Sequence, residues 1–251
     1  MTIESLDGKV AFISGASRWV GAGLAERFAE GGLRLVLCSR TSPALAASET
    51  VIAACLDVRD EKALEALVGQ AEERFGAIDL WVNNAGVLEP IQPVRDVSLE
   101  DFREHIDINL TGVFVGTRTY VRHLRRLQKG GVLINVSSGA SWNPYAGWGA
   151  YCASKAGVER LTEVVAVEEA EIGLRAYSIA PGVVDTTMQS LIRASSAEDF
   201  PDVERFQERK RSENFNSARY VADEFLAIAF DPDRRQESVA VRLEDEPRSA
   251  S

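Results

Sequence analysis

Tyr151 and Lys155 are the residues whose types and spacing most directly suggest chemistry. Residues four apart on a helix share one face, so the Lys155 ammonium would stay near the Tyr151 phenol. A nearby positive charge favours phenolate, which brings a side chain with an ordinary pKa of about 10 closer to neutral pH. Ser138, thirteen residues upstream, would hydrogen-bond a substrate carbonyl. These residues predict a proton-transfer site; an exposed Tyr–Lys pair and a strand-end serine cap are the simpler alternatives.

A second group of residues, near the N-terminus, has the composition of a phosphate-binding loop. Gly15, Gly21 and Gly23 lie between an apolar run and a helical pattern. Glycine lets the backbone approach a pyrophosphate, and a helix N-terminus offers unpaired N–H groups and a positive dipole end. The segment 83–86, Asn-Asn-Ala-Gly, follows another apolar run. We therefore expect a dinucleotide cradle here, with a tight turn that binds nothing as the alternative.

The elements that must position these residues are short apolar runs alternating with helical patterns. Such runs are typical of parallel strands that are buried on both faces. The segment 98–101, Ser-Leu-Glu-Asp, is a capping box that opens a long helix. The alternation predicts an α/β fold with a doubly wound, mostly parallel seven-stranded sheet and helices on both faces. The strands are expected at residues 10–14, 33–39, 51–56, 78–82, 132–136, 174–180 and 237–243.

Composition narrows the class of protein. The length of 251 residues and 45% hydrophobic content suit one buried core, and we expect a single domain over residues 1–251. The net charge of −10 argues against nucleic-acid binding. Three cysteines and two histidines without ligand spacing suggest neither disulfides nor a metal site. No apolar run approaches the roughly 18 residues of a membrane span, so we expect a soluble, cytoplasmic protein that does not bind membranes.

The pattern changes after Pro181 and Gly182. The segment from about 186 to 216 is charged and irregular, and it precedes a helical pattern at 218–230. We interpret this segment as a flap that closes over substrate and excludes water. Its apolar residues would equally suit a purely structural amphipathic helix.

In these motifs, the chain resembles the short-chain dehydrogenase/reductase family over about residues 7 to 245. The resemblance implies an NAD(P)-dependent oxidoreductase with one Rossmann-type domain, usually a dimer or tetramer. One departure is Ser14, where the family usually has threonine, and another is the bulky Trp19 inside the glycine loop. The residues that carry the resemblance are the glycine segment, Asn83 to Gly86, Asn109, Ser138, Tyr151, Lys155, Pro181 and Gly182.

The resemblance also implies roles for individual residues. Asn109 resembles the residue that keeps a water in a proton relay from Lys155, although it also suits a helix kink. Asp57 resembles an aspartate that contacts adenine, although a structural turn-former is the alternative. Catalysis is expected from Asn109, Ser138, Tyr151 and Lys155. Dinucleotide binding is expected from Gly15, Ser17, Arg18, Val20, Gly21, Ser39, Arg40, Asp57, Val58, Asn84, Ala85, Gly86, Tyr151, Lys155, Pro181, Gly182, Val184 and Thr186.

Charge at the end of the second strand predicts which nicotinamide dinucleotide is used. NAD enzymes generally place an acidic residue there to bind the ribose 2′-hydroxyl, and such a carboxylate repels a 2′-phosphate. No acidic residue occurs between Glu30 and Glu49. Instead Ser39 and Arg40 close the strand, and Arg18 lies in the glycine loop. Two guanidinium groups and a hydroxyl would suit a phosphate, so we expect NADP(H), unless the arginines simply face solvent.

Substrate class is approached through three segments, 84–90, 147–151 and 181–189, which resemble the sepiapterin reductase and benzil reductase branch. That branch reduces vicinal dicarbonyl groups. Trp142, Tyr145 and Trp148 would form an aromatic wall for an aryl substrate, or else pack structurally. The C-terminal stretch carries Arg242 where sepiapterin reductases have a pterin-binding aspartate. We therefore favour a ketone or dicarbonyl reductase over a dedicated sepiapterin reductase.

Other functions are possible for a chain with these motifs, and particular residues distinguish them. A 3-oxoacyl-type or other alcohol dehydrogenase of the same family is the nearest alternative. A serine hydrolase is disfavoured because His105 and His123 both precede Ser138 and no histidine follows it. A noncatalytic NADP(H)-binding sensor would be expected to have lost Tyr151 or Lys155. Two long helices, about 99–127 and 151–172, have more apolar residues than one sheet face needs, which predicts a four-helix interface in a homodimer or homotetramer.

Overall fold

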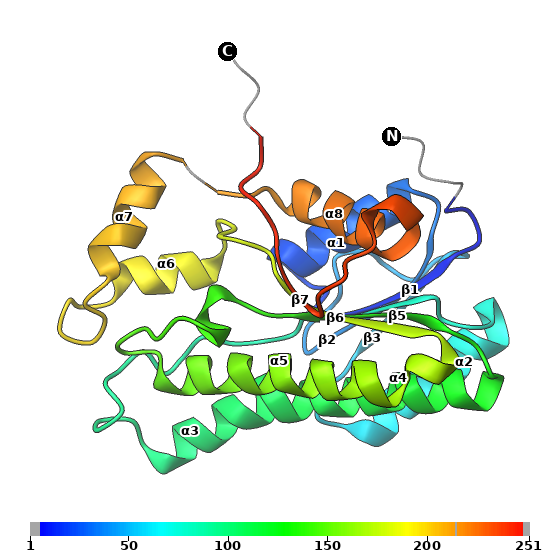
Figure 1. Ribbon diagram of the computed structural model, residues 1–251, viewed down its shortest axis with the longest axis horizontal. Helices are drawn as coiled ribbons and strands as arrows, with labels where there is room; N and C mark the ends of the chain where they lie inside the picture. Colours follow the sequence, from blue (N-terminus) through cyan, green and yellow to red (C-terminus); the bar gives the residue numbers. More distant parts are fainter. Residues whose placement is uncertain (1–5, 214, 248–251) are drawn as a thin grey trace.

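The computed structural model describes residues 6–213 and 215–247, and within them seven parallel strands form one sheet (Figure 1). The strand order is β3-β2-β1-β4-β5-β6-β7, and every ladder between neighbours is parallel. The doubly wound α/β prediction is confirmed, with a fully parallel rather than a mostly parallel sheet. The strands are β1 (Val10–Ser14), β2 (Arg34–Ser39), β3 (Val51–Cys55), β4 (Leu80–Asn83), β5 (Gly131–Val136), β6 (Leu174–Ala180) and β7 (Ala240–Arg242).

Helices cover both faces of the sheet, which explains why its strands are apolar on both sides (Figure 1). On one face, α1 (Trp19–Glu30) and α8 (Ala218–Phe230) enclose a core that includes Phe28 and Phe225. On the other face, α2 (Glu61–Phe75), α4 (Gly112–Leu127) and α5 (Gly149–Glu168) cover a core centred on Trp81. Trp81 stacks on Phe12 with ring centroids 3.6 Å apart.

The order of the strands fixes where a ligand can enter. The chain winds outward from β1 to β3 and then returns to β4 on the other side of β1. Connections therefore leave the carboxyl ends of β1 and β4 in opposite directions, and a crevice opens between them. In doubly wound sheets, ligands bind at this switch point.

The long helix expected at 99–127 is interrupted. The hydroxyl of Ser98 accepts a hydrogen bond from the N–H of Asp101, which confirms the predicted cap. The helix then runs as α3 (Leu99–Ile106), a π-helical turn η1 (Asp107–Thr111) and α4. Asn109 lies in that turn. Single π turns inside α-helices are frequent at functional sites.

The segment interpreted as a flap contains two short helices, α6 (Thr187–Ala194) and α7 (Val203–Arg211), which lie side by side at one end of the sheet (Figure 1). Asp185 holds them together through ion pairs with Arg193 on α6 and Lys210 on α7. Short 3-10 segments complete the fold: η2 (Gly139–Ser141), η3 (Ala170–Ile172) and η4 (Pro232–Arg234).

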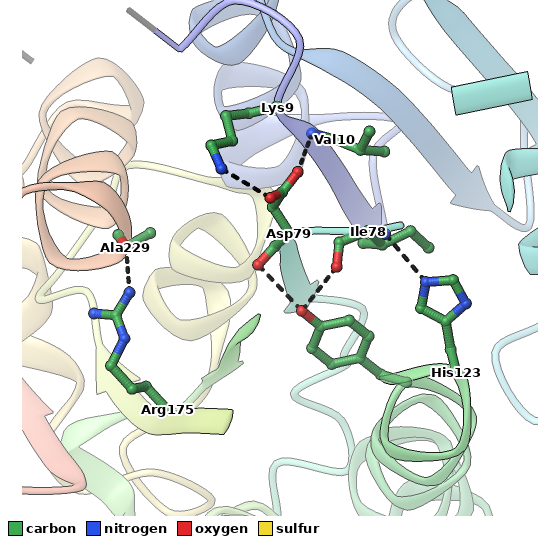
Figure 2. A network of polar contacts seen from close by, with 8 residues as sticks. Lys9, Val10, Ile78, Asp79, His123, Arg175 and Ala229 are labelled. Carbon is green, nitrogen blue, oxygen red and sulfur yellow. Dashed lines mark hydrogen bonds and ion pairs between the residues drawn. The ribbon is translucent and has the colours of Figure 1, made fainter. Parts of the chain in front are cut away.

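A polar network closes the amino ends of β1 and β4, opposite the crevice (Figure 2). The carboxylate of Asp79 accepts hydrogen bonds from Lys9 Nζ and the Val10 N–H, both at 3.0 Å. The Tyr120 hydroxyl lies 3.1 Å from the carbonyl oxygens of Ile78 and Asp79. The Ile78 N–H donates to His123 Nε2 rather than to a strand, so β4 begins at Leu80 instead of the predicted residue 78.

Among the residues that the structure describes, no helix combines the length and apolarity that a membrane crossing requires.

Candidate active site

A cavity of about 650 Å³ lies at the carboxyl ends of the strands, where the switch point was expected. Its volume falls within the roughly 300–1,000 Å³ of ordinary ligand pockets. All of the residues predicted to bind the dinucleotide line its wall, from Gly15 in the first loop to Thr186 before α6. Ser138, Tyr151 and Lys155 line the same wall. The sequence motifs therefore meet in one place.

The glycine loop is built for close backbone contact. Gly15 has φ +67°, and a Cβ added there would lie 2.8 Å from Ala85 Cα. A Cβ on Gly21 would lie 2.2 Å from the carbonyl oxygen of Gly15. Gly23 has a different function, since its Cβ would meet Ala218 on α8 at 2.4 Å. Gly15 and Gly21 therefore shape the cradle, and Gly23 lets α1 pack on α8.

The hydroxyl of Ser14 ties the two halves of the crevice together. Its Oγ accepts hydrogen bonds from the backbone N–H groups of Asn84 at 3.0 Å and Ala85 at 3.2 Å. Asn84 Nδ2 in turn donates to the carbonyl oxygens of Ser14 and Gly15. Serine supplies the same hydroxyl as threonine, which accounts for this departure from the family pattern.

The start of α1 combines an open N-terminus with a bulky side chain. Arg18 is the extended N-cap residue and forms no capping hydrogen bond through its side chain. The first N–H groups of α1 are therefore available to an anion. Trp19 has φ +55°, in the left-handed region that favours glycine, and its side chain is 47% exposed. It lines the cavity without closing it.

The opposite wall contains Ser39, Arg40 and Asp57. The Ser39 hydroxyl donates to the carbonyl of Thr41 at 2.6 Å. Arg59 binds the Asp57 carboxylate through its backbone N–H, Nε and Nη2, and these hydrogen bonds hold the pKa of Asp57 below its ordinary value. Asp57 thus stabilises its own turn, as the turn-former interpretation expects. It also lines the cavity, and its contact with adenine stays a prediction.

Ser138, Tyr151 and Lys155 come together from two elements. Ser138 follows β5, where its hydroxyl caps η2 at the Ala140 N–H, and Tyr151 and Lys155 lie one turn apart on α5. Burial raises the pKa of Tyr151 to about 12, and the hydrogen bond with Ser138 opposes that rise. Burial also lowers the pKa of Lys155 to about 8. Burial therefore raises the pKa of Tyr151 by more than the nearby Lys155 ammonium was expected to lower it. With this pKa the phenol is protonated at neutral pH.

Asn109 is not among the described residues that line the cavity; it lies behind them. Its Oδ1 accepts from the Val87 N–H at 2.8 Å, and its Nδ2 donates to the Val87 carbonyl at 2.7 Å. Nδ2 also lies 2.8 Å from Nε2 of His105, whose pKa burial lowers. The side chain therefore fixes the segment beside Gly86, near Lys155. Sequence reasoning missed His105, although its spacing of four from Asn109 on a helix was a signal.

Aromatic rings surround Tyr151. Trp148 meets it edge to face with centroids 5.6 Å apart, and stacks on Phe200 at 4.7 Å. Tyr145 lies 4.9 Å from Trp148, and both residues line the cavity. Trp148 is 4% exposed and packs in a buried cluster, so it also has the structural function given as the alternative. Trp142 lies outside the described wall and is 41% exposed.

The turn after β6 is held by a residue that sequence reasoning missed. Gly182 has φ +77°, and the Asn216 amide packs against it and donates to the Pro181 carbonyl at 2.9 Å. The N–H of Asn216 also donates to the Val183 carbonyl at 2.8 Å. Asn216 thereby places Val184 and Thr186 at the cavity. No short-range motif connects Asn216 to residues more than thirty positions earlier.

The wall fits a nicotinamide dinucleotide by its own geometry. The glycine cradle, the uncapped start of α1 and the volume of the cavity suit an extended ligand with phosphates at its centre. A parallel sheet with this switch-point crevice places the chain among the dinucleotide-binding α/β proteins.

A family model described as short chain dehydrogenase matches residues 9–197, and the chain belongs to this family. Its members are oxidoreductases that act on CH–OH and C=O groups and bind nicotinamide cofactors. The resemblance inferred from the motifs is confirmed.

Individual relatives and solved structures agree with this assignment. The chain is 35% identical to a benzil reductase ((S)-benzoin forming) of Bacillus cereus over 85% of this chain and 91% of that protein. It is 37% identical to 3beta-hydroxysteroid dehydrogenase 1 of Eggerthella lenta over 80% and 77% of the two chains. The crystal structure of the KRED1-Pglu enzyme superposes with a TM-score of 0.81 at 31% identity, covering 89% of this chain and 95% of that one. Carveol dehydrogenase from Mycobacterium avium in complex with NAD gives a TM-score of 0.80 at 28% identity, covering 95% and 97%.

Proposed function

We propose that this protein is an NADPH-dependent carbonyl reductase that reduces a ketone or a vicinal dicarbonyl compound. The observation that carries the proposal is the buried Tyr151 side chain in the cavity wall, together with Ser138 and Lys155. The similarity to benzil reductases over most of the chain supports the same substrate class.

In the proposed reaction the substrate carbonyl oxygen accepts hydrogen bonds from the Ser138 and Tyr151 hydroxyls. A bound nicotinamide supplies the hydride to the carbonyl carbon. Tyr151 donates its proton to the oxygen as negative charge develops there, which is general acid catalysis. Lys155, whose Nζ donates to the Val136 carbonyl at 2.8 Å, holds a positive charge beside the phenol and stabilises the phenolate that remains.

Asn109 and the segment after β6 position these groups. Asn109 fixes the chain at Val87, next to Gly86, and we assign it a positioning function in the proton relay from Lys155. Val184 and Thr186 would hold the nicotinamide carboxamide. Residues 186–216, with α6 and α7, would act as a flap over the substrate in a single domain of residues 1–251. Closure of this flap would exclude water from the reacting groups.

NADPH is the proposed dinucleotide because Arg18 and Arg40 line the cavity beside Ser39, and no acidic residue lies between Glu30 and Glu49. Guanidinium groups bind phosphate through charge-assisted hydrogen bonds. The solved carveol dehydrogenase is in complex with NAD, so the choice between the two dinucleotides has to be made on this chain's own residues. A preference for NADH over NADPH in steady-state turnover would overturn the assignment.

We also propose a homodimer or homotetramer built on the helices of one face. Large apolar side chains are exposed there: Leu99 and Phe102 on α3, Phe114 on α4, and Val164 and Val167 on α5. Val167 is 81% exposed in the single chain. Pairing these faces between two copies would cover them. Light scattering that showed a monomer would remove this proposal.

The test is the loss of NADPH absorbance in the presence of benzil and other diketones, with NADPH binding measured separately by fluorescence. Turnover of a diketone supports the reductase. Tight NADPH binding without reduction of any carbonyl or oxidation of any alcohol would instead favour a noncatalytic sensor. The similarity to a hydroxysteroid dehydrogenase favours alcohol oxidation as the second candidate, which reduction of NADP⁺ by hydroxysteroids would reveal.

A further inference from the structure

Charge on the cavity wall is opposite in sign to that of the whole chain. The chain has 38 acidic and 28 basic residues, for a net charge of −10. The cavity, in contrast, is lined by more basic than acidic side chains. The basic residues are Arg18, Arg40, Lys155, Arg205, Arg209 and Arg242, and the acidic ones are Asp57 and Glu89.

Apart from Lys155, the basic residues fall into two groups along the fold. Arg18 and Arg40 follow β1 and β2, where we place the dinucleotide phosphate. Arg205 and Arg209 belong to α7 and Arg242 ends β7, which are elements of the other side of the cavity. This second group has no function in the reaction proposed above.

Neighbours of the second group connect it to the reacting groups. Arg205 and Arg209 flank Phe206 on α7, and Phe206 packs in the same buried cluster as Trp148 and Tyr151. Arg242 is paired in register with Ala180, which also lines the cavity, immediately before the Pro181 turn. The cavity wall also has an apolar part on α6 and α7. It includes Met188, Leu191, Ile192 and Phe206.

Neighbouring basic residues are neutralised, but two of these arginines are not. Asp185 binds Arg193 and Lys210, and Glu208 binds Arg211. Within residues 6–213 and 215–247, Arg205 and Arg242 form no ion pair with a carboxylate. Apart from Asp57, which binds Arg59, Glu89 is the one acidic residue that lines the cavity within the described residues. A ligand carboxylate would supply the missing negative charge.

We propose that the natural substrate carries a carboxylate on an apolar, aryl-like body, and that Arg205, Arg209 and Arg242 bind this carboxylate while Trp148 and Phe206 contact the body. The inference rests on the proposed reductase function, because it names the substrate class of that same site. The reducible carbonyl would lie at Ser138 and Tyr151, with the carboxylate at the distal end.

The test compares benzil with 4-carboxybenzil, which present the same diketone with and without a distal carboxylate. The wild-type protein should have a kcat/KM about tenfold higher for the carboxylated compound, and this preference should shrink as NaCl is raised. The double variant Arg205→Gln/Arg242→Gln should raise KM for 4-carboxybenzil about tenfold, with KM for benzil and kcat for both compounds within twofold of wild type. Arg211→Gln, on the same helix but paired with Glu208, should change neither KM.

Two results would overturn the inference: a wild-type preference for benzil, or an equal change of KM for both compounds in the double variant. If circular dichroism showed that the double variant does not fold, Arg205→Lys/Arg242→Lys would replace it and should keep most of the carboxylate preference. If neither compound were reduced, the reductase proposal would fail separately. Calorimetric binding of the two compounds in the presence of NADP⁺ would then decide, with equal affinities counting against a carboxylate site.

Discussion

The ammonium of Lys155 lies 5.6 Å from the centroid of the Tyr151 ring, and burial moves the pKa values of the two groups apart. The pKa of Tyr151 rises to about 12 and that of Lys155 falls to about 8. At neutral pH the pair is therefore a neutral phenol beside a positive charge. This is the protonation state that carbonyl reduction requires.

The pH dependence of reduction should follow Lys155. Because the pKa of Lys155 is about 8, kcat/KM for the diketone should be level below that pH and decline above it as the ammonium loses its proton. Steady-state rates at saturating NADPH measure this profile. An active Lys155→Arg variant, which stays charged, should lose the decline. A wild-type profile that fell with an apparent pKa near 6 would point to a different titrating group.

The Arg40→Gln substitution should weaken the binding of NADPH but not that of NADH. Removing one guanidinium from the proposed 2′-phosphate site should raise KM for NADPH about tenfold, since a charge-assisted hydrogen bond contributes roughly 1.5 kcal/mol or more. KM for NADH should change little, because NADH has no phosphate there. Parallel kinetics with the two dinucleotides provide the measurement. An equal loss with both would mean that Arg40 supports the loop rather than the phosphate.

His123 should make the free energy of unfolding depend on pH. It is buried in the network of Figure 2, and burial lowers its pKa below the ordinary value. As pH falls, His123 therefore binds a proton in the unfolded chain before it does so in the folded chain. Its contribution to the free energy of unfolding is complete above about pH 6.5 and decreases as pH drops through the folded pKa. His105, also buried with a lowered pKa, should act in the same direction.

Urea unfolding at about pH 7.5 and about pH 5.5 tests this prediction, because most carboxyl groups titrate below that range. His123→Gln keeps a hydrogen-bond acceptor for the Ile78 N–H without a proton to gain, so its difference between the two pH values should be smaller than that of the wild type. A variant with the same pH difference as the wild type would show that His123 does not contribute.

Trp19→Gly should stabilise the folded chain. A left-handed backbone costs a bulky residue roughly 1–2 kcal/mol, and the greater freedom of unfolded glycine returns part of that, which leaves about 1 kcal/mol. Calorimetry should therefore show a Tm about 2–4 °C higher. Trp19→Ala keeps the strained backbone and should bring no such gain. A lower Tm for the glycine variant would mean that indole packing outweighs strain.

Much of the fold was predictable because its strands are buried on both faces and so appear as continuous apolar runs. β1 and β6 begin and end at the predicted residues. β4 begins later than predicted and β7 is shorter at both ends, because tertiary contacts decide where pairing begins. At Ile78, for example, the N–H donates to His123. The π turn at Asn109 could not be located from the apolar periodicity, because one added residue in a helix does not change that periodicity enough to be recognised.

The site was predictable where its residues are close in sequence or follow the carboxyl ends of neighbouring strands. The Ser14 hydroxyl and Asn84 meet because β1 and β4 are neighbours. Two features were missed: Asn216, which holds the turn after β6, and the arginines of α7, which line the wall. Their positions depend on how the chain returns after β6. The state of Tyr151 also depends on burial, which the Tyr–Lys spacing alone does not give.

The most direct test of the account is turnover by Tyr151→Phe, measured together with NADPH binding. Removing the hydroxyl deletes the proposed proton donor while keeping the ring against Trp148, so kcat for diketone reduction should fall by about a thousandfold. NADPH affinity, followed by fluorescence, should stay within about threefold of the wild type. A variant that bound NADPH normally and retained most of its reductase activity would contradict the assignment of Tyr151 as the general acid.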